Sequence, residues 1–180
     1  MRFDLKLKII CDILCNLKPN MFCASIKKEE KMSKLEKELI LPEVAICQSF
    51  EELRALADQT LDCKEKMIYY WGGVENLVDV FDEEYEREFY IPTRLKRGIG
   101  LKLIIPDSQM LEDYQETDAQ ENRETRTLRP EMMMDSSFMI HDDTVVYFGE
   151  PDDHYAIEVK SSSLARALKI MFNNAWNHTE

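Results

Sequence analysis

The spacing of apolar positions along residues 43–178 alternates between short continuous runs and helical periodicity, which predicts strands and helices in turn. Short apolar runs predict strands at 44–47, 67–71, 101–105, 138–141, 144–149 and 155–160. Apolar residues at helical spacing predict helices at 49–61, 77–89 and 164–176. Strands that alternate with helices and end in a meander favour an α/β sandwich with a mixed sheet.

Individual residues mark where several of these elements begin and end. Ser49 and Glu52 form a capping-box pattern that predicts a helix start, and Gly98 is placed as a helix C-cap. Ser162 or Ser163 is expected to cap the last helix. Residues 112–131 are polar and charged with weak periodicity, so the pattern gives no clear element there.

The segment before this body carries a helical pattern of its own. Residues 26–40 predict a charged helix in which Met32, Leu35 and Leu39 share one side. That stripe is too narrow to be buried by one chain alone, and such stripes commonly pack against an identical partner. The pattern therefore predicts a linker helix that dimerises.

Composition indicates a folded and strongly acidic body. Hydrophobic residues make up 44% of the 180 positions, which is enough for a core. The net charge is −12: residues 1–40 hold nine Lys or Arg and six Asp or Glu, and residues 41–180 hold 14 and 29. An acidic body of that size repels phosphate backbones, so we do not expect residues 41–180 to bind nucleic acid by themselves.

Cysteine usage and hydropathy place the chain in the cytoplasm. Five cysteines, an odd number without a CxxC pair, fit a reducing cytosol. No run of residues is long and apolar enough for a transmembrane helix. His154 beside Asp152 and Asp153 is a weak alternative for a metal site, and a solvated loop is favoured. No glycine-rich phosphate loop occurs, so no cofactor is expected.

Basic residues stand out in the acidic body as candidate ligand contacts. They could line an anion or sugar-phosphate pocket, because guanidinium groups bind phosphate through paired hydrogen bonds. Pairing with nearby carboxylates is the alternative, and it is favoured. Trp71 could stack on a sugar, although alternate residues of a strand face opposite sides and one set belongs to the core. The candidate contacts are Arg94, Arg97, Arg123, Arg126 and Trp71.

A series of short motifs runs in order from residue 94 to residue 176. The helix end RLKRGI, the strand IIPD and the Arg-rich link RETR occupy 94–99, 104–107 and 123–126. The hairpin IHDDTVV at 140–146 and a closing strand and helix from Ile157 to Trp176 complete the series. This order resembles the C-terminal effector domain of TrmB-type transcriptional regulators. The resemblance implies one half of a phospholipase D-type α/β fold.

The resemblance divides the chain into three parts. Residues 1–25 would hold a remnant of a winged-helix domain, residues 26–41 the linker and dimerisation helix, and residues 43–178 the effector domain. Full-length members carry a complete winged helix-turn-helix before the linker, and this chain departs from that pattern. We therefore expect it to contact DNA only indirectly.

A regulatory role follows from the same resemblance. It implies an effector-sensing or dimerisation domain that forms a homodimer, or a heterodimer with an intact paralogue. A sugar or sugar phosphate is the implied effector, and no membrane partner is expected. A pure protein-interaction module is an alternative.

The motif of phospholipase D-type enzymes is not matched at the one candidate position. Those enzymes use H-x-K-x4-D, in which the Lys holds phosphate. Asp143 and Phe148 stand where the Lys and Asp would follow His141. An acidic side chain in the phosphate-holding place would repel the substrate. The chain is therefore not expected to be an enzyme, with a divergent phosphodiesterase as the alternative.

Overall fold

The computed structural model describes residues 41–74, 80–150 and 153–179, and residues 42–180 form one compact unit. The predicted winged-helix remnant at 1–25 lies outside the described residues. The predicted dimerisation helix, with Met32, Leu35 and Leu39, lies outside them too. Both stay predictions.

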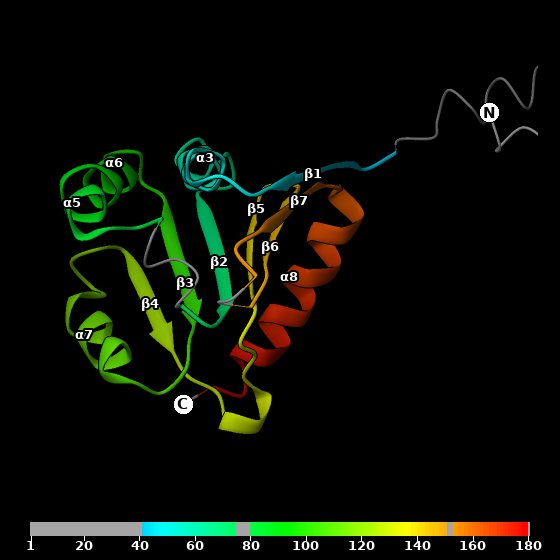
Figure 1. Cartoon of the computed structure of the whole chain (residues 1–180). Helices are drawn as coiled ribbons and strands as arrows, with labels where there is room; N and C mark the ends of the chain where they lie inside the picture. Colours follow the sequence, from blue (N-terminus) through cyan, green and yellow to red (C-terminus); the bar gives the residue numbers. More distant parts are fainter. Residues whose placement is uncertain (1–40, 75–79, 151–152, 180) are drawn as a thin grey trace, which may run out of the picture. The chain divides into compact units, whose positions relative to one another are not determined.

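A mixed seven-stranded sheet, counted over the described residues, forms the centre of the unit (Figure 1). Its order is β1-β7-β6-β5-β2-β3-β4, with β2, β3 and β4 parallel and the remaining pairs antiparallel. The predicted mixed α/β class is confirmed. The strands are β1 (Glu43–Cys47), β2 (Met67–Gly72), β3 (Gly100–Ile104), β4 (Arg123–Arg126), β5 (Ser137–His141), β6 (Thr144–Phe148) and β7 (Ala156–Lys160).

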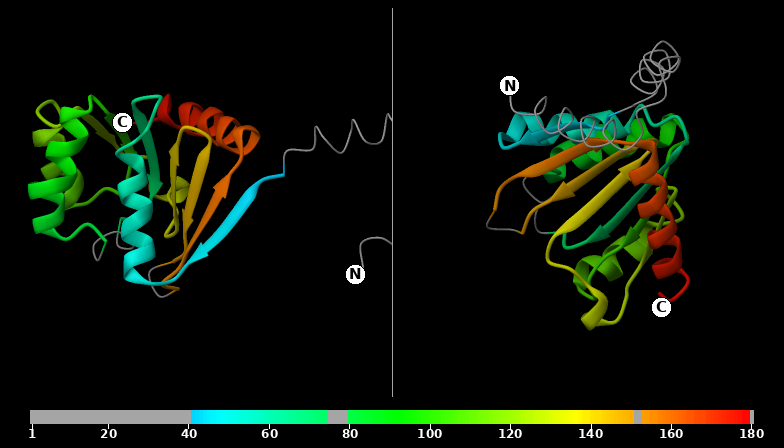
Figure 2. Two further views of the ribbon diagram at one scale, coloured as in Figure 1. Left: turned by 90° about the horizontal axis from the view of Figure 1, so that it is seen from above. Right: turned by 90° about the vertical axis from the view of Figure 1, so that its right-hand side faces the viewer.

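Helices cover both faces of this sheet. In Figure 2, α8 lies across one face, and α3 and α7 lie on the opposite side. The described helical elements are α3 (Phe50–Thr60), α5 (Glu83–Tyr85), the π-helical turn η1 (Glu86–Tyr90), α6 (Ile91–Lys96), α7 (Gln109–Thr117), the 3-10 turn η2 (Pro130–Met132) and α8 (Ser162–Trp176). Among the described residues, none of these helices is long and apolar enough to cross a bilayer.

Strand β2 shows how the alternating sequence fills both cores. Ile68 and Tyr70 are buried with Leu56 of α3 and Leu111 of α7. The intervening residues, Tyr69 and Trp71, pack on the other face against Phe172 and Trp176 of α8. Successive side chains of a strand point to opposite faces, so one apolar run contributes to two packed layers.

Local signals fix most element ends, with two corrections. The capping box at Ser49 and Glu52 forms, and Gly98 adopts a left-handed φ of 66° after α6, as predicted. The last helix is capped by Ser161, whose hydroxyl accepts from the Leu164 amide, so the assignment to Ser162 or Ser163 was wrong. Residues 123–126 are a strand paired with β3 and not a connecting link.

A candidate ligand-binding cavity

A cavity of about 470 Å³ lies between the sheet and the helical segments α5 to α6 and α7. That volume is within the ~300–1,000 Å³ typical of small-molecule sites. The sheet supplies its base from β2, β3, β4 and β5, and the helices supply its walls. The lining residues are Ile68, Tyr70, Val74, Phe81, Asp82, Glu83, Glu86, Tyr90, Ile91, Arg94, Leu101, Leu103, Met110, Tyr114, Arg123 and Met139.

Aromatic rings form much of the cavity wall. Phe81 and Tyr90 contact edge to face with ring centroids 4.8 Å apart. The Tyr90 hydroxyl lies 2.7 Å from the Thr60 hydroxyl, which joins this wall to α3. Tyr114 comes from α7 on the opposing wall, and burial raises its pKa to about 12. These rings are held by packing and hydrogen bonds, so the cavity is preformed.

The turn that carries this wall departs from α-helical geometry. Glu86 to Tyr90 form a π-helical turn between α5 and α6. Pro92 sits in the first turn of α6, where its missing amide is tolerated. A π turn widens the helix locally and is found frequently at functional sites. Here it places Glu86 and Tyr90 on the cavity.

Arg94 is the most deeply buried basic residue of the site. Its side chain is only 1% exposed. Its Nη1 donates to the carbonyl oxygens of Ile99 and Asn122 at 2.9 and 3.2 Å, and its Nη2 donates to that of Glu121 at 2.7 Å. Its Nε has no hydrogen-bond partner among the described residues. Arg94 therefore fastens α6 to the starts of β3 and β4.

Arg123 is neutralised by two carboxylates. Its Nε and Nη1 donate to Asp118 and Glu121, each at 2.7 Å. Its Nη2 donates to the Tyr114 carbonyl and the Thr117 hydroxyl. The guanidinium lies over the Tyr114 ring, 4.1 Å from the centroid. Most of its donors are thus committed inside the protein.

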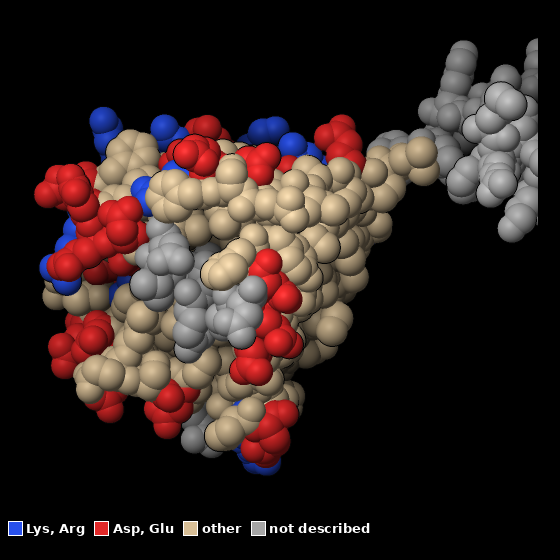
Figure 3. All heavy atoms as spheres, viewed as in Figure 1, with Lys and Arg blue, Asp and Glu red and all other residues tan. Residues whose placement is uncertain are grey.

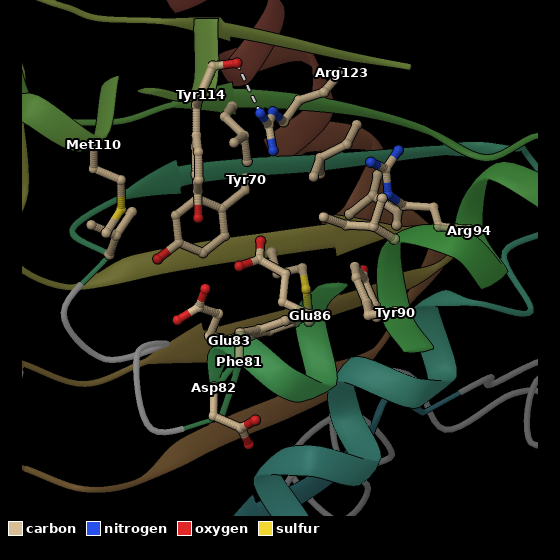
Figure 4. Close-up of a pocket in the computed structure, with 16 residues that line it drawn as sticks. Tyr70, Phe81, Asp82, Glu83, Glu86, Tyr90, Arg94, Met110, Tyr114 and Arg123 are labelled. Carbon is tan, nitrogen blue, oxygen red and sulfur yellow. Dashed lines mark hydrogen bonds between the residues drawn. The ribbon is translucent and has the colours of Figure 1, made fainter. Parts of the chain in front are cut away.

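Carboxylates occupy the other part of the cavity. Figure 4 shows Glu83 and Glu86 pointing toward the rings of Tyr70 and Tyr114, while Arg94 lies at the opposite side. Burial raises the pKa of the half-buried Glu86, and the charge of Arg123 opposes that shift. Among the described residues, Glu86 has no ion-pair partner within 4.0 Å.

The structure brings two of the five sequence candidates together. Arg94 and Arg123 both line the cavity. Arg97 instead bonds to the Leu61 carbonyl and to Asp62. Arg126 stacks on the Trp176 ring, 4.3 Å from the centroid, and Trp71 packs on the α8 face.

Sequence reasoning missed the residues that give the cavity its chemistry. Glu86, Tyr70, Phe81 and Tyr114 were not singled out as a set, because they come from separate elements. The dense mixture of acidic and aromatic residues at 81–90 was the available signal.

The two histidines weighed from the sequence lie outside this cavity. His141, at the end of β5, is 5% exposed, and neither ring nitrogen has a partner among the described residues. Burial lowers its pKa. His154 is exposed in the segment before β7. Within the described ranges, no group of three or more His, Cys, Asp or Glu is arranged to hold a metal ion.

Comparison with known proteins rests on three-dimensional structure. No protein-family model matches this chain, and no curated protein matches it in sequence. The archaeal chromatin protein TrmBL2, whose structure shows a novel mode of DNA binding, matches with a TM-score of 0.55 at 16% identity. That match covers 98% of this chain and 66% of TrmBL2, so the chain spans just under two thirds of that protein.

Two similar structures come from the phospholipase D side of the resemblance. Nuc from Salmonella typhimurium, a phospholipase D family member, matches with a TM-score of 0.53 at 18% identity, over 78% of this chain and 97% of Nuc. NucT from Helicobacter pylori matches with a TM-score of 0.52 at 10% identity, over 77% of this chain and 98% of NucT.

These similarities establish the fold and correct one expectation. The chain has a TrmB-like and phospholipase D-like α/β fold. The expectation that it is not an enzyme is contradicted, because the fold is shared with Nuc and NucT. The mismatch at Asp143 and Phe148 after His141 concerns one candidate motif, and it does not exclude an enzyme with this fold.

Proposed function

We propose that this chain is a ligand-sensing regulatory module of the TrmB type, with the cavity beside η1 as its effector site. The cavity carries the proposal, because it is roomy, largely apolar and preformed, with a few polar groups converging on it. The structural likeness to TrmBL2 supports the regulatory role.

A ligand in this cavity would act by linking separate elements. The cavity is bounded by η1 and α6 on one side, by α7 on another and by the sheet beneath. A molecule that contacts all three binds only the folded state and therefore stabilises it. Such binding can alter the population of conformers seen by a partner protein. We propose that DNA is affected through that partner and not by direct contact with the acidic body.

Thermal unfolding with a small-molecule panel tests the proposal. The panel contains sugars, sugar phosphates, amines and aromatic acids, and the readout is the shift of the melting midpoint. Met110→Trp fills the cavity from α7, and Met132→Trp adds the same bulk at an exposed position of η2. We expect a hit to stabilise the wild type and Met132→Trp but not Met110→Trp. A panel without any stabilising compound would count against the proposal.

A phosphodiesterase is the second candidate function, and the likeness to Nuc and NucT favours it. The assay is hydrolysis of a chromogenic phosphodiester by the full chain. Activity that His141→Ala abolishes would assign the reaction to the β5–β6 hairpin. Activity that survives this change but disappears in Met110→Trp would assign it to the cavity.

Self-association also stays a proposal, with Met32, Leu35 and Leu39 as its suggested contacts. Light scattering should report a dimer at tens of micromolar protein. Deletion of residues 1–40 should weaken that dimer while the sheet unit stays folded. A dimer of undiminished stability would place the contact on the sheet unit instead.

A further inference from the structure

We propose that the cavity binds an organic cation, an ammonium group on an apolar or aromatic body, with Glu86 as its counter-ion. The inference rests on the proposed function, since it names the ligand class of the same site. It replaces the sugar phosphate implied by the sequence resemblance with a ligand of opposite charge.

The arginines do not offer an anion site. A phosphate or carboxylate ligand would need free donors, yet Arg123 already bonds to Asp118 and Glu121. Arg94 directs three donors to main-chain carbonyls and lies at the opposite side from the cavity's carboxylates. Its remaining Nε is buried, and a ligand anion would have to break contacts that hold β3 and β4 to α6. The basic side chains of the cavity therefore act as parts of its wall.

Glu86 is the carboxylate of the cavity without an ion-pair partner among the described residues, whereas the buried Arg94 is held by main-chain carbonyls. Asp82 pairs with Arg54 at 2.7 Å, and Glu83 lies 3.4 Å from Arg87. Glu86 has no such partner, although it is partly removed from water. The Tyr114 side chain gives Glu86 a hydrogen bond but no positive charge. A partly desolvated carboxylate without an adjacent cation is costly, and an incoming cation would lower that cost.

The aromatic rings suit the same ligand. Tyr70 and Phe81 line the cavity close to the carboxylates of Glu83 and Glu86 (Figure 4). The negative faces of aromatic rings attract ammonium groups, most strongly where water is excluded. Arg123 over the Tyr114 ring shows that this cavity already holds one cation–π contact.

The surface around the cavity favours the approach of a cation. Figure 3 shows mostly acidic side chains on the side of the molecule where α5 and α7 lie. A cleft with carboxylates at its surface raises the local concentration of cations and lowers that of anions. The apolar part of the wall, which includes Leu101, Leu103 and Met139, requires that the ligand also carry an apolar body.

Three ligands of matched shape test the inference: tryptamine, tryptophol and indole-3-propionate, which are cationic, neutral and anionic at pH 7. Binding to the full chain is measured by calorimetry and by the melting midpoint. We expect tryptamine to bind about tenfold or more tightly than tryptophol, and indole-3-propionate to bind most weakly. One tenfold step corresponds to about 1.4 kcal/mol.

Two conservative variants locate the effect. Glu86→Gln should remove the preference for tryptamine and leave tryptophol affinity unchanged. Glu84→Gln, which alters an exposed carboxylate two positions earlier, should preserve the preference. Circular dichroism confirms that both variants fold.

The outcomes separate this inference from the proposed function. Equal or tighter binding of tryptophol or indole-3-propionate would overturn the cation assignment and leave a ligand-binding cavity in place. The same holds if all three indoles fail while a sugar, a sugar phosphate or an aromatic acid of the panel stabilises the wild type but not Met110→Trp. If no compound of either set binds, both proposals fail.

Discussion

Replacing Arg94 by methionine should destabilise the sheet unit far more than the same change at Arg97. Both arginines belong to the end of the same helix, but only Arg94 is buried and bonded to three carbonyl oxygens. Methionine keeps much of the side-chain volume and removes the charge and the donors. The comparison therefore isolates the cost of those lost hydrogen bonds.

The magnitude follows from which acceptors lose their partners. The Asn122 carbonyl also accepts from the Leu101 amide, so it keeps one hydrogen bond. The carbonyls of Ile99 and Glu121 each lose the bond from Arg94. The Ile99 carbonyl is buried and the Glu121 carbonyl partly buried, so their lost bonds together cost ~2–5 kcal/mol. Removal of a desolvated charge offsets part of this, so we expect a net loss of about 3 kcal/mol.

Urea unfolding measures the effect. With a slope of ~2 kcal/mol per molar urea, a loss of about 3 kcal/mol lowers the midpoint by roughly 1.5 M. Arg97→Met removes a largely exposed pair with Asp62 and one hydrogen bond to the Leu61 carbonyl, and should cost about 1 kcal/mol. If Arg94→Met does not fold, Arg94→Lys, which can satisfy only some of the acceptors, should fold and still be less stable than Arg97→Met. Equal midpoints for Arg94→Met and Arg97→Met would refute the reasoning.

Two further predictions concern the sheet. Burial lowers the pKa of His141, so below the usual histidine pKa of ~6.5 the unfolded chain binds a proton that the folded chain resists. The free energy of unfolding should therefore be lower at pH 5.5 than at pH 7.5. The decrease occurs below pH ~6.5 and is at most ~1.4 kcal/mol per pH unit. This dependence should be weaker in His141→Phe but unchanged in His178→Gln, an exposed control, when melting is followed at both pH values. At Gly72, φ is 130° and an added Cβ would lie 2.2 Å from the Ser136 carbonyl oxygen. Gly72→Ala should therefore lower the free energy of unfolding by ~3 kcal/mol or more, measured by urea unfolding. Gly98 has a φ of 66° but open space around the added Cβ, so Gly98→Ala should cost about 1–2 kcal/mol. Similar costs at the two sites would contradict the steric argument.

The sequence predicted most of the elements that bury one or both of their faces, because burial gives such elements an apolar pattern. Strands β2, β3, β5, β6 and β7 each contain apolar side chains that pack under a helix, so their short apolar runs predicted them. Strand β4 was missed because its four residues, RETR, include no apolar side chain. It is an edge strand whose Arg123 and Thr125 are fixed by hydrogen bonds to Asp118, a tertiary contact that no local pattern contains.

The cavity was less predictable than the fold for a related reason. Its lining comes from four strands and from the segments around η1 and α7, so their proximity depends on the finished topology. The π turn at 86–90 follows no helical period, and a regular helix through the same residues would place Glu86 and Tyr90 differently. Charge alone drew attention to the arginines, because basic residues are conspicuous in an acidic chain.

Burial and bonding assign the cavity's arginines to structure and its carboxylate Glu86 to ligand binding, the reverse of what the sequence charges suggested. Arg94 and Arg123 bond to carbonyls and carboxylates of the protein. These bonds connect α6, α7 and β4 and leave few donors for a ligand. Glu86 is left without an ion-pair partner among the described residues, beside aromatic rings and in a cavity large enough for a small molecule. A partly buried carboxylate without an adjacent cation favours a cationic ligand, because part of its desolvation cost already falls on the folded state before the ligand binds. Our proposal therefore assigns ligand recognition to the carboxylate of Glu86, and the arginines hold together the elements that surround it.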